Sequence, residues 1–102
     1  MAVARIVLVK LKPELANPEG RASLAAAVRA ALTGDSDLLA LHVELPADAD
    51  SERSWDLALR LELASQDAFE RLSARERYRG LFERELPARA VVVKAWSFIP
   101  SA

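Results

Sequence analysis

The sequence of 102 residues contains no cysteine and one histidine, His42. The lack of cysteine excludes a disulfide framework, a thiolate zinc site and a cysteine nucleophile. A single histidine excludes a histidine-rich metal site within one chain. The three glycines are isolated from one another and therefore form no phosphate-binding loop. We expect neither a cofactor nor a bound metal.

Long apolar runs and an excess of one charge are also missing. No run approaches the roughly 20 apolar residues that a membrane-spanning helix needs, and Arg5 and Lys10 interrupt the apolar start in a way that is not typical of a secretory signal. Fourteen basic and fifteen acidic residues give a net charge of −1, which attracts no phosphate backbone. We expect a soluble, cytoplasmic protein that binds neither membranes nor nucleic acid.

The length is typical of one domain, residues 1–102, and the apolar residues recur with two periods. Strands are indicated where apolar side chains alternate, and helices where they recur every three or four positions. Asn17 is a candidate helix cap before Pro18, and Gly34 ends the same helical pattern. The predicted elements are a strand over 3–11, a helix over 17–34, strands over 38–45 and 55–63, a helical region over 65–86 and a strand over 90–98.

The order β-α-β-β-α-β predicts an α+β, ferredoxin-like fold with a four-stranded antiparallel sheet. Both helical regions would cover one face of that sheet and leave the other face open. The open face is too apolar to remain in water, so we expect a second copy of the chain to cover it and complete a dimeric α/β barrel. The residues assigned to this face are Ala40, His42, Asp56, Ala58, Arg60, Val92, Lys94, Trp96 and Phe98.

Three segments, "RIVLVKLKPE", "WDLALRLELASQDAFERL" and "RAVVVKAWSF", resemble the stress-responsive A/B barrel (Dabb) domain family across nearly the whole chain. The resemblance implies a homodimeric α+β barrel. Members of that family are mostly uncharacterised or associated with stress, and a few are polyketide cyclases that catalyse an aldol condensation without a cofactor.

The chain departs from the family where catalytic residues often lie. Arg5 stands where a histidine often precedes the "IVL" run. In the second helical region, Arg71 takes the place of a tyrosine, Ala74 and Arg75 that of a His-Pro pair, and Arg77 that of a second histidine. Arginine stays protonated and therefore cannot act as a general base. These departures favour a small-molecule-binding or structural module over a cofactor-independent lyase, isomerase or cyclase.

His42 is the candidate catalytic residue, because only histidine has an ordinary pKa near neutrality. A general base needs an oriented partner, and Glu44 and Asp56 are the candidates for that role. The alternative is a strand histidine that bonds to a neighbour or faces water.

The candidate ligand-binding residues are Arg5, Arg60, Asp56 and Trp96. Arg5 and Arg60 are assigned to the interior of the barrel, where a guanidinium binds a carboxylate or phenolate through two hydrogen bonds. Alternatively, each arginine forms an internal ion pair with Asp56 or Glu62. Trp96 either lines an apolar pocket or packs in the dimer interface.

The stretch "ERLSARERYR" (70–79) carries four arginines around the only tyrosine of the chain. Ser73 and Glu76 have the spacing of a capping box, which predicts that one helix ends near Leu72 and another begins at Ala74. The apolar positions Ala74, Tyr78, Leu81 and Phe82 form the predicted buried stripe. The link over 46–54 is polar and acidic, as is typical of a solvated hairpin loop.

Overall fold

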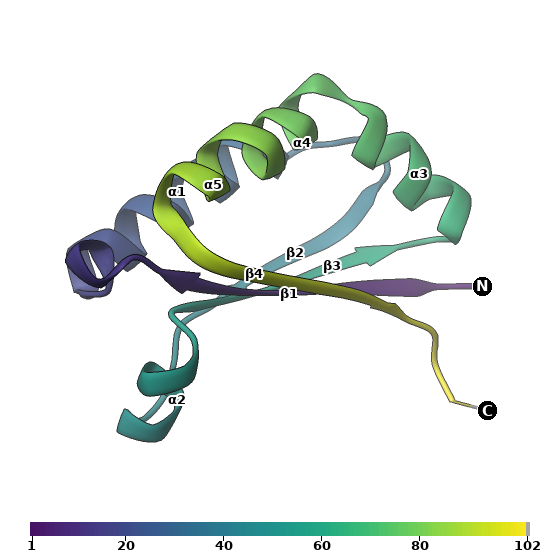
Figure 1. The fold of residues 1–102 in the computed structure, drawn as a ribbon. Coiled ribbons are helices and arrows are strands. Elements are labelled where there is room, and N and C mark those ends of the chain that lie inside the picture. The colour runs from purple at the N-terminus through teal and green to yellow at the C-terminus, as the bar shows by residue number, and fades with distance from the viewer. Residues whose placement is uncertain (102) are drawn as a thin grey trace.

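Four antiparallel strands form one sheet in the computed structural model, which describes residues 1–101. They follow the spatial order β2-β3-β1-β4 (Figure 1). This order and the helical crossovers are those of the split βαβ arrangement, so the predicted α+β, ferredoxin-like fold is confirmed. The strands are β1 (Val3–Leu11), β2 (Leu38–Glu44), β3 (Leu57–Leu63) and β4 (Ala90–Phe98).

All but one of the α-helices lie on one face of the sheet, and α2 (Ala49–Ser54) lies beyond the opposite face (Figure 1). No helix in residues 1–101 is long and apolar enough to cross a membrane. The covering elements are α1 (Pro18–Leu32), α3 (Gln66–Ala74), α4 (Glu76–Gly80), the π-helical turn η2 (Leu81–Glu85) and α5 (Leu86–Arg89), and a short 3-10 turn, η1 (Pro13–Leu15), precedes α1.

The core lies between the sheet and these helices. Alternate residues of β1 and β3 face the helices and are buried, because side chains two positions apart in a strand share a face. The core side chains from the two strands and from α1 include Val7, Val9, Leu11, Leu24, Val28, Leu32, Leu57, Leu59, Leu61 and Leu63.

Helix α1 begins and ends as the sequence predicts. The side chain of Asn17 accepts a hydrogen bond of 2.8 Å from the backbone N–H of Gly20, which satisfies one of the free donors in the first turn. Gly34 has a φ of 83°, a conformation that glycine adopts without a steric penalty. A Cβ at Gly20 would lie 1.8 Å from the carbonyl oxygen of Leu15, so glycine is required where η1 meets α1.

The start of β2 differs from the predicted alternation. Leu38 pairs with Leu63, whereas the next partner along β3, Glu62, pairs with Ala40. One extra residue therefore lies in β2, and a bulge of this kind reverses which face the side chains point to. As a result Leu38 packs against the core and Leu39 is exposed, whereas unbroken alternation over 38–45 would place Leu39 on the same face as Leu41 and Val43.

The link between β2 and β3 holds a short helix rather than only a solvated loop. The carboxylate of Asp48 accepts a hydrogen bond of 2.8 Å from the N–H of Ser51, which caps the start of α2. The predicted strand over 55–63 begins two residues too early. Trp55 ends α2, and its backbone N–H bonds to the carbonyl of Ser51, so β3 begins only at Leu57.

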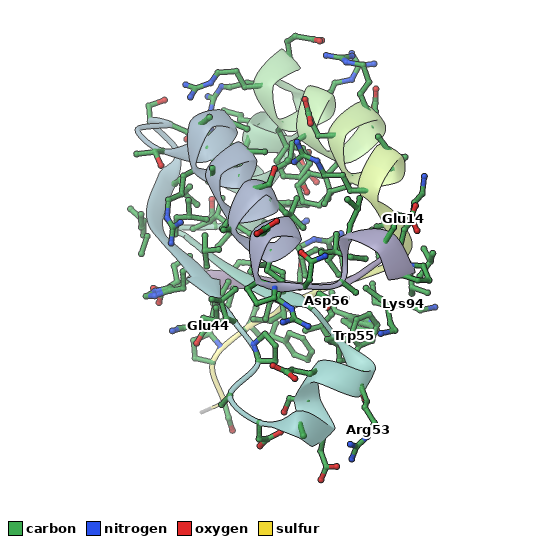
Figure 2. The ribbon with its side chains drawn as sticks, turned by 90° about the vertical axis from the view of Figure 1, so that its left-hand side faces the viewer. Glu14, Glu44, Arg53, Trp55, Asp56 and Lys94 are labelled. Atoms are coloured by element: carbon green, nitrogen blue, oxygen red, sulfur yellow. The ribbon has the colours of Figure 1, made fainter. Side chains whose placement is uncertain are left out.

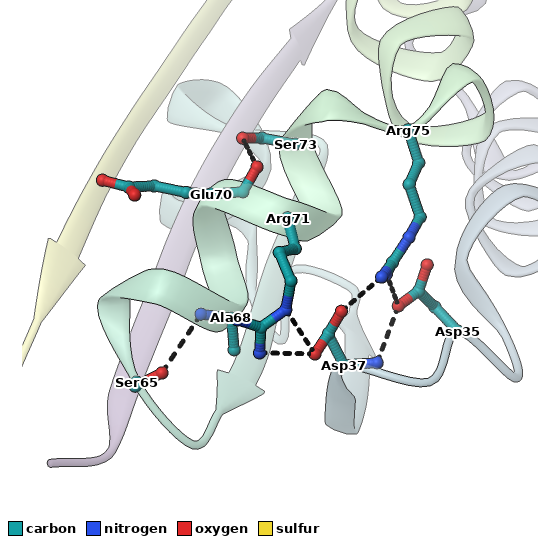
Figure 3. Close-up of polar contacts among 8 residues, drawn as sticks. All are labelled: Asp35, Asp37, Ser65, Ala68, Glu70, Arg71, Ser73 and Arg75. Atoms are coloured by element: carbon teal, nitrogen blue, oxygen red, sulfur yellow. Dashed lines mark hydrogen bonds and ion pairs between the residues drawn. The ribbon is translucent and has the colours of Figure 1, made fainter.

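The second helical region is interrupted at Arg75, within a few residues of the predicted break (Figure 3). The predicted capping box is wrong, because the hydroxyl of Ser73 donates to the carbonyl of Glu70 instead of capping α4. Ion pairs join the two sides of this break to the turn that precedes β2. Nη2 of Arg71 lies 2.9 Å from the carboxylate of Asp37. Arg75 pairs with the same carboxylate and also with Asp35, at 2.6 Å.

Acid should weaken this four-residue cluster of Asp35, Asp37, Arg71 and Arg75. Hydrogen bonds from Arg71 and then from Arg75 lower the pKa of Asp37 from 3.8 to about 2. A lowered pKa in the folded state means that the stabilisation is present above pH 3.8 and is lost as the pH falls to about 2. Between pH 3.8 and about 2, we expect the free energy of unfolding to fall less in Asp37→Asn than in the unmodified protein. Urea unfolding at successive pH values measures this difference. An identical pH profile for both proteins would contradict this assignment.

Candidate functional site

The face of the sheet away from the covering helices carries a polar half and an apolar half. Strand register defines rows across this open face, because directly paired residues point to the same side. The polar side chains lie on β2 and β3, and the apolar ones lie mainly on β1 and β4. From β2 to β4 the rows are Ala40, Glu62, Ala4 and Phe98; then His42, Arg60, Ile6 and Trp96; then Glu44, Ala58, Leu8 and Lys94.

His42 meets a carboxylate on this face, although not either of the predicted ones. Its Nε2 lies 2.6 Å from Oε2 of Glu62, so the prediction that Glu44 or Asp56 orients His42 is wrong. The hydrogen bond with His42 lowers the pKa of Glu62, and the charge of Arg60 adds to this effect. Glu62 also lies 3.7 Å from Nη1 of Arg60, the contact that the ion-pair alternative for Arg60 describes, although both side chains are partly exposed in the single chain.

Two hollows lie at opposite ends of the open face. The first, of about 500 Å³, lies where the sheet meets α2, and Glu44 and Trp55 are at this junction (Figure 2). The second, of about 380 Å³, lies beside the end of β4 and includes Phe98, Ile99 and Pro100. Neither hollow is bounded by His42, Arg5 and Arg60 together.

Arg5 is not on the open face, which corrects the prediction. It pairs in register with Leu61, and that residue is buried beneath the helices. On this inner side, Nη1 of Arg5 donates a hydrogen bond of 3.1 Å to the hydroxyl of Ser97. The guanidinium carbon lies 4.8 Å from the centre of the Phe69 ring, which is within cation–π range. Arg5 and His42 therefore lie on opposite faces of the sheet and share no site.

The inner side around Arg5 contains an unpaired polar atom. Nε of Arg5 is buried and has no hydrogen-bond partner among the described residues. No carboxylate of the described residues forms an ion pair with this guanidinium, although most other arginines have one. A partly buried cation with no counter-charge is costly and is a natural binding group for an anion.

Tyr78 belongs to the same inner site, although the spacing of apolar residues predicted it only as a member of the buried stripe. Its ring meets the edge of Phe69 with centres 6.0 Å apart and stacks on Phe82 at 4.3 Å. Burial raises the pKa of the Tyr78 hydroxyl above its ordinary value of 10.0, and the positive charge of Arg5 opposes part of the rise. Phe82 lies in the π-helical turn η2, a geometry that is frequent at functional sites.

Tyr78 is the only tyrosine of the chain, so its ionisation can be followed directly. We expect the folded protein to show a phenolate midpoint above pH 10.0, because burial disfavours the charged form. Arg5→Met should raise this midpoint further, since the substitution removes a nearby positive charge. The measurement is the phenolate absorbance of the native protein against pH. A midpoint that falls in Arg5→Met would show that the two groups do not interact as described.

Asp56 is buried inside the protein and is not available to a ligand on the open face, contrary to the prediction. It is 0% exposed. Its Oδ2 accepts a hydrogen bond of 2.8 Å from the backbone N–H of Leu11, and its Oδ1 accepts bonds of 3.1 and 3.0 Å from Arg21. Asp56 therefore joins the start of β3 to β1 and α1. Trp96, in contrast, lies on the open face as predicted and is 46% exposed.

Comparison with known proteins identifies the fold. No family model and no curated protein matches the sequence. Among solved structures, a Dabb family protein with a ferredoxin-like fold from Mesorhizobium loti superposes with a TM-score of 0.82 at 11% identity, over 99% of this chain and 98% of that chain. The Dabb resemblance of the sequence is thus confirmed at the level of the fold.

Two further structures share this fold. A dimeric ferredoxin-like protein of unknown function from Thermobifida fusca has a TM-score of 0.78 and 17% identity, over 98% of this chain and 92% of that chain. A hydroxynitrile lyase from Passiflora edulis has a TM-score of 0.80 and 13% identity, over 98% and 94% of the two chains. The same fold therefore occurs in a protein of unknown function and in an enzyme, so the fold alone does not define an activity.

Proposed function

We propose that the protein is a homodimer, formed through the open sheet face, that binds a small anionic molecule beside Arg5. The apolar half of the open face supports the dimer. Burying the apolar surface of Ile6, Trp96 and Phe98 in an interface would be favourable in free energy. Trp96 and Phe98 are 46% and 56% exposed in the single chain. A solved structure with the same fold is described as dimeric, which also favours this assembly.

The unpaired Nε of Arg5 is the observation that carries the binding function. The guanidinium offers donors that match a carboxylate, and the Phe69 ring that it contacts belongs to an aromatic cluster with Tyr78 and Phe82. Those rings favour a ligand with a planar, apolar part. The proposed ligand class is therefore an aromatic or similarly flat carboxylate. The association with stress and the cytoplasmic location remain predictions from the sequence.

Isothermal titration calorimetry with benzoate as the probe tests this assignment. We expect binding to the unmodified protein and a loss of at least about tenfold in affinity for Arg5→Met, since hydrogen bonds to charged groups contribute about 1.5–3 kcal/mol. Arg60→Met is the matched control, because Arg60 lies on the other face of the sheet. Equal losses for the two variants, or none for Arg5→Met, would contradict a site at Arg5.

A second candidate function is acid–base catalysis by His42. The 2.6 Å contact with Glu62 gives the imidazole the oriented partner that a general base requires. A hydroxynitrile lyase with the same fold makes a cofactor-independent lyase, isomerase or polyketide-cyclase-like activity the relevant class. Turnover of a hydroxynitrile or a polyketide-like acid that survives unchanged in His42→Ala would exclude this role.

A further inference from the structure

A mostly polar segment that carries a few apolar residues and a short apolar segment project from opposite corners of the open face. We call residues 45–56, between β2 and β3, the arm, and residues 99–101, after β4, the tail. Because β2 and β4 are the two edge strands and all neighbouring strands are antiparallel, the arm and the tail leave the sheet at opposite ends and near opposite edges. Both extend on the side away from the covering helices (Figure 1).

The arm is concave where it meets the sheet, and the tail is a short apolar segment. The arm borders the open hollow of about 500 Å³. Its lining includes the apolar residues Leu8, Leu45, Pro46, Trp55 and Ala58 and the polar residues Glu44, Asp50, Ser51 and Ser54. Leu45 is 59% exposed at its rim, and in the tail Ile99 is also 59% exposed. Each feature therefore leaves apolar surface in water in the single chain, and each could cover the other in an assembly.

We infer that the tail of each subunit occupies the arm hollow of its partner. This inference rests on the proposed homodimer and specifies its symmetry. In a face-to-face dimer the twofold axis lies in the plane of the face. To place the tail corner of one subunit on the arm corner of the other, this axis must run roughly along the other diagonal. The strands of the two sheets then cross at a large angle, as in orthogonal sheet packing, where two sheets close into a barrel-like unit. Self-complementary contact of this kind is what a twofold dimer requires.

Other twofold axes in the plane of the face pair these features less well. An axis parallel to the strands keeps each end of the sheet on the same end of the partner but exchanges the two edges, so both arms lie at one end over opposite edges and neither arm meets a tail. In that arrangement the tail of the partner does not reach the arm hollow. The diagonal axis brings the two together and places Ile99 and Pro100 against Leu45 and Pro46.

Cysteine cross-linking tests the contact without background, because the chain contains no cysteine. Leu45→Cys and Ile99→Cys both replace exposed side chains, so the folded core is unchanged. The two single variants are mixed in equal amounts, allowed to exchange subunits and oxidised. We expect a disulfide-linked dimer in the mixture and none, or far less, with either variant alone. Ala22→Cys, on an exposed position of α1, mixed with Ile99→Cys is the matched control.

Sedimentation of the unmodified protein, run in parallel, separates the two hypotheses. A dimer that fails to cross-link in the mixture, or that cross-links through Ile99→Cys alone, would overturn the tail and arm contact and leave the proposed dimer intact. A monomer at micromolar concentration would overturn both. Cross-linking in the mixture of Leu45→Cys and Ile99→Cys, but not in the control mixture, supports the inferred contact.

Discussion

Replacing Asp56 with alanine is expected to lower the free energy of unfolding by about 3 kcal/mol or more. Removal of one partner from a buried ion pair leaves an uncompensated charge, which typically costs 3–5 kcal/mol. Here the side chain of Arg21 is only 12% exposed and would lose its closest carboxylate. The backbone N–H of Leu11 would also lose its acceptor at 2.8 Å, and a buried unsatisfied donor carries its own penalty.

Two control variants separate these contributions. Glu52→Ala removes the other carboxylate near Arg21, but that contact is 3.7 Å long and Glu52 is about half exposed, so we expect little change in stability. Asp56→Asn keeps an acceptor for Leu11 and loses only the charge, so its effect should be intermediate. Urea unfolding of the three variants provides the comparison. A loss in Asp56→Ala no larger than that in Glu52→Ala would show that the buried pair does not stabilise the fold.

The sheet and its faces were predictable because they depend on the spacing of apolar residues. The leucines of β3 recur at every second position, and all of them are buried against the helices. Arg5 shows how this rule also applies to a charged residue. It shares the alternation of Val3 and Val7, and this position decides that it points toward the helices. The prediction assigned Arg5, together with Arg60, to the interior of the barrel, and for Arg5 that assignment was wrong.

Contacts between side chains on different elements were not predictable, because they depend on register and on where strands begin. His42 reaches Glu62 across a strand pair whose register is shifted by the bulge in β2. Asp56 falls one residue before β3, so the alternation of that strand does not apply to it. Tyr78 and Arg5 are far apart in the sequence, and no local pattern connects them.

Introducing a charge at Trp96 is expected to dissociate the proposed dimer. Trp96 lies beside Ile6 in the middle row of the open face, and tryptophan is the residue type most enriched among positions that dominate interface energies. Loss of such a side chain costs about 2 kcal/mol or more, which corresponds to a rise of roughly 30-fold in the dissociation constant. Trp96→Arg adds the cost of burying a charge without a partner. Sedimentation equilibrium measures the effect.

The fold of the single subunit should survive this substitution, because Trp96 is outside the core and is 46% exposed. Unchanged circular dichroism would establish that dissociation does not follow from unfolding. Ala22→Arg, at an exposed position of α1, introduces the same charge on the opposite side of the molecule and should leave the dimer intact. If both variants kept the dissociation constant of the unmodified protein, the interface would have to lie away from the apolar half of the open face.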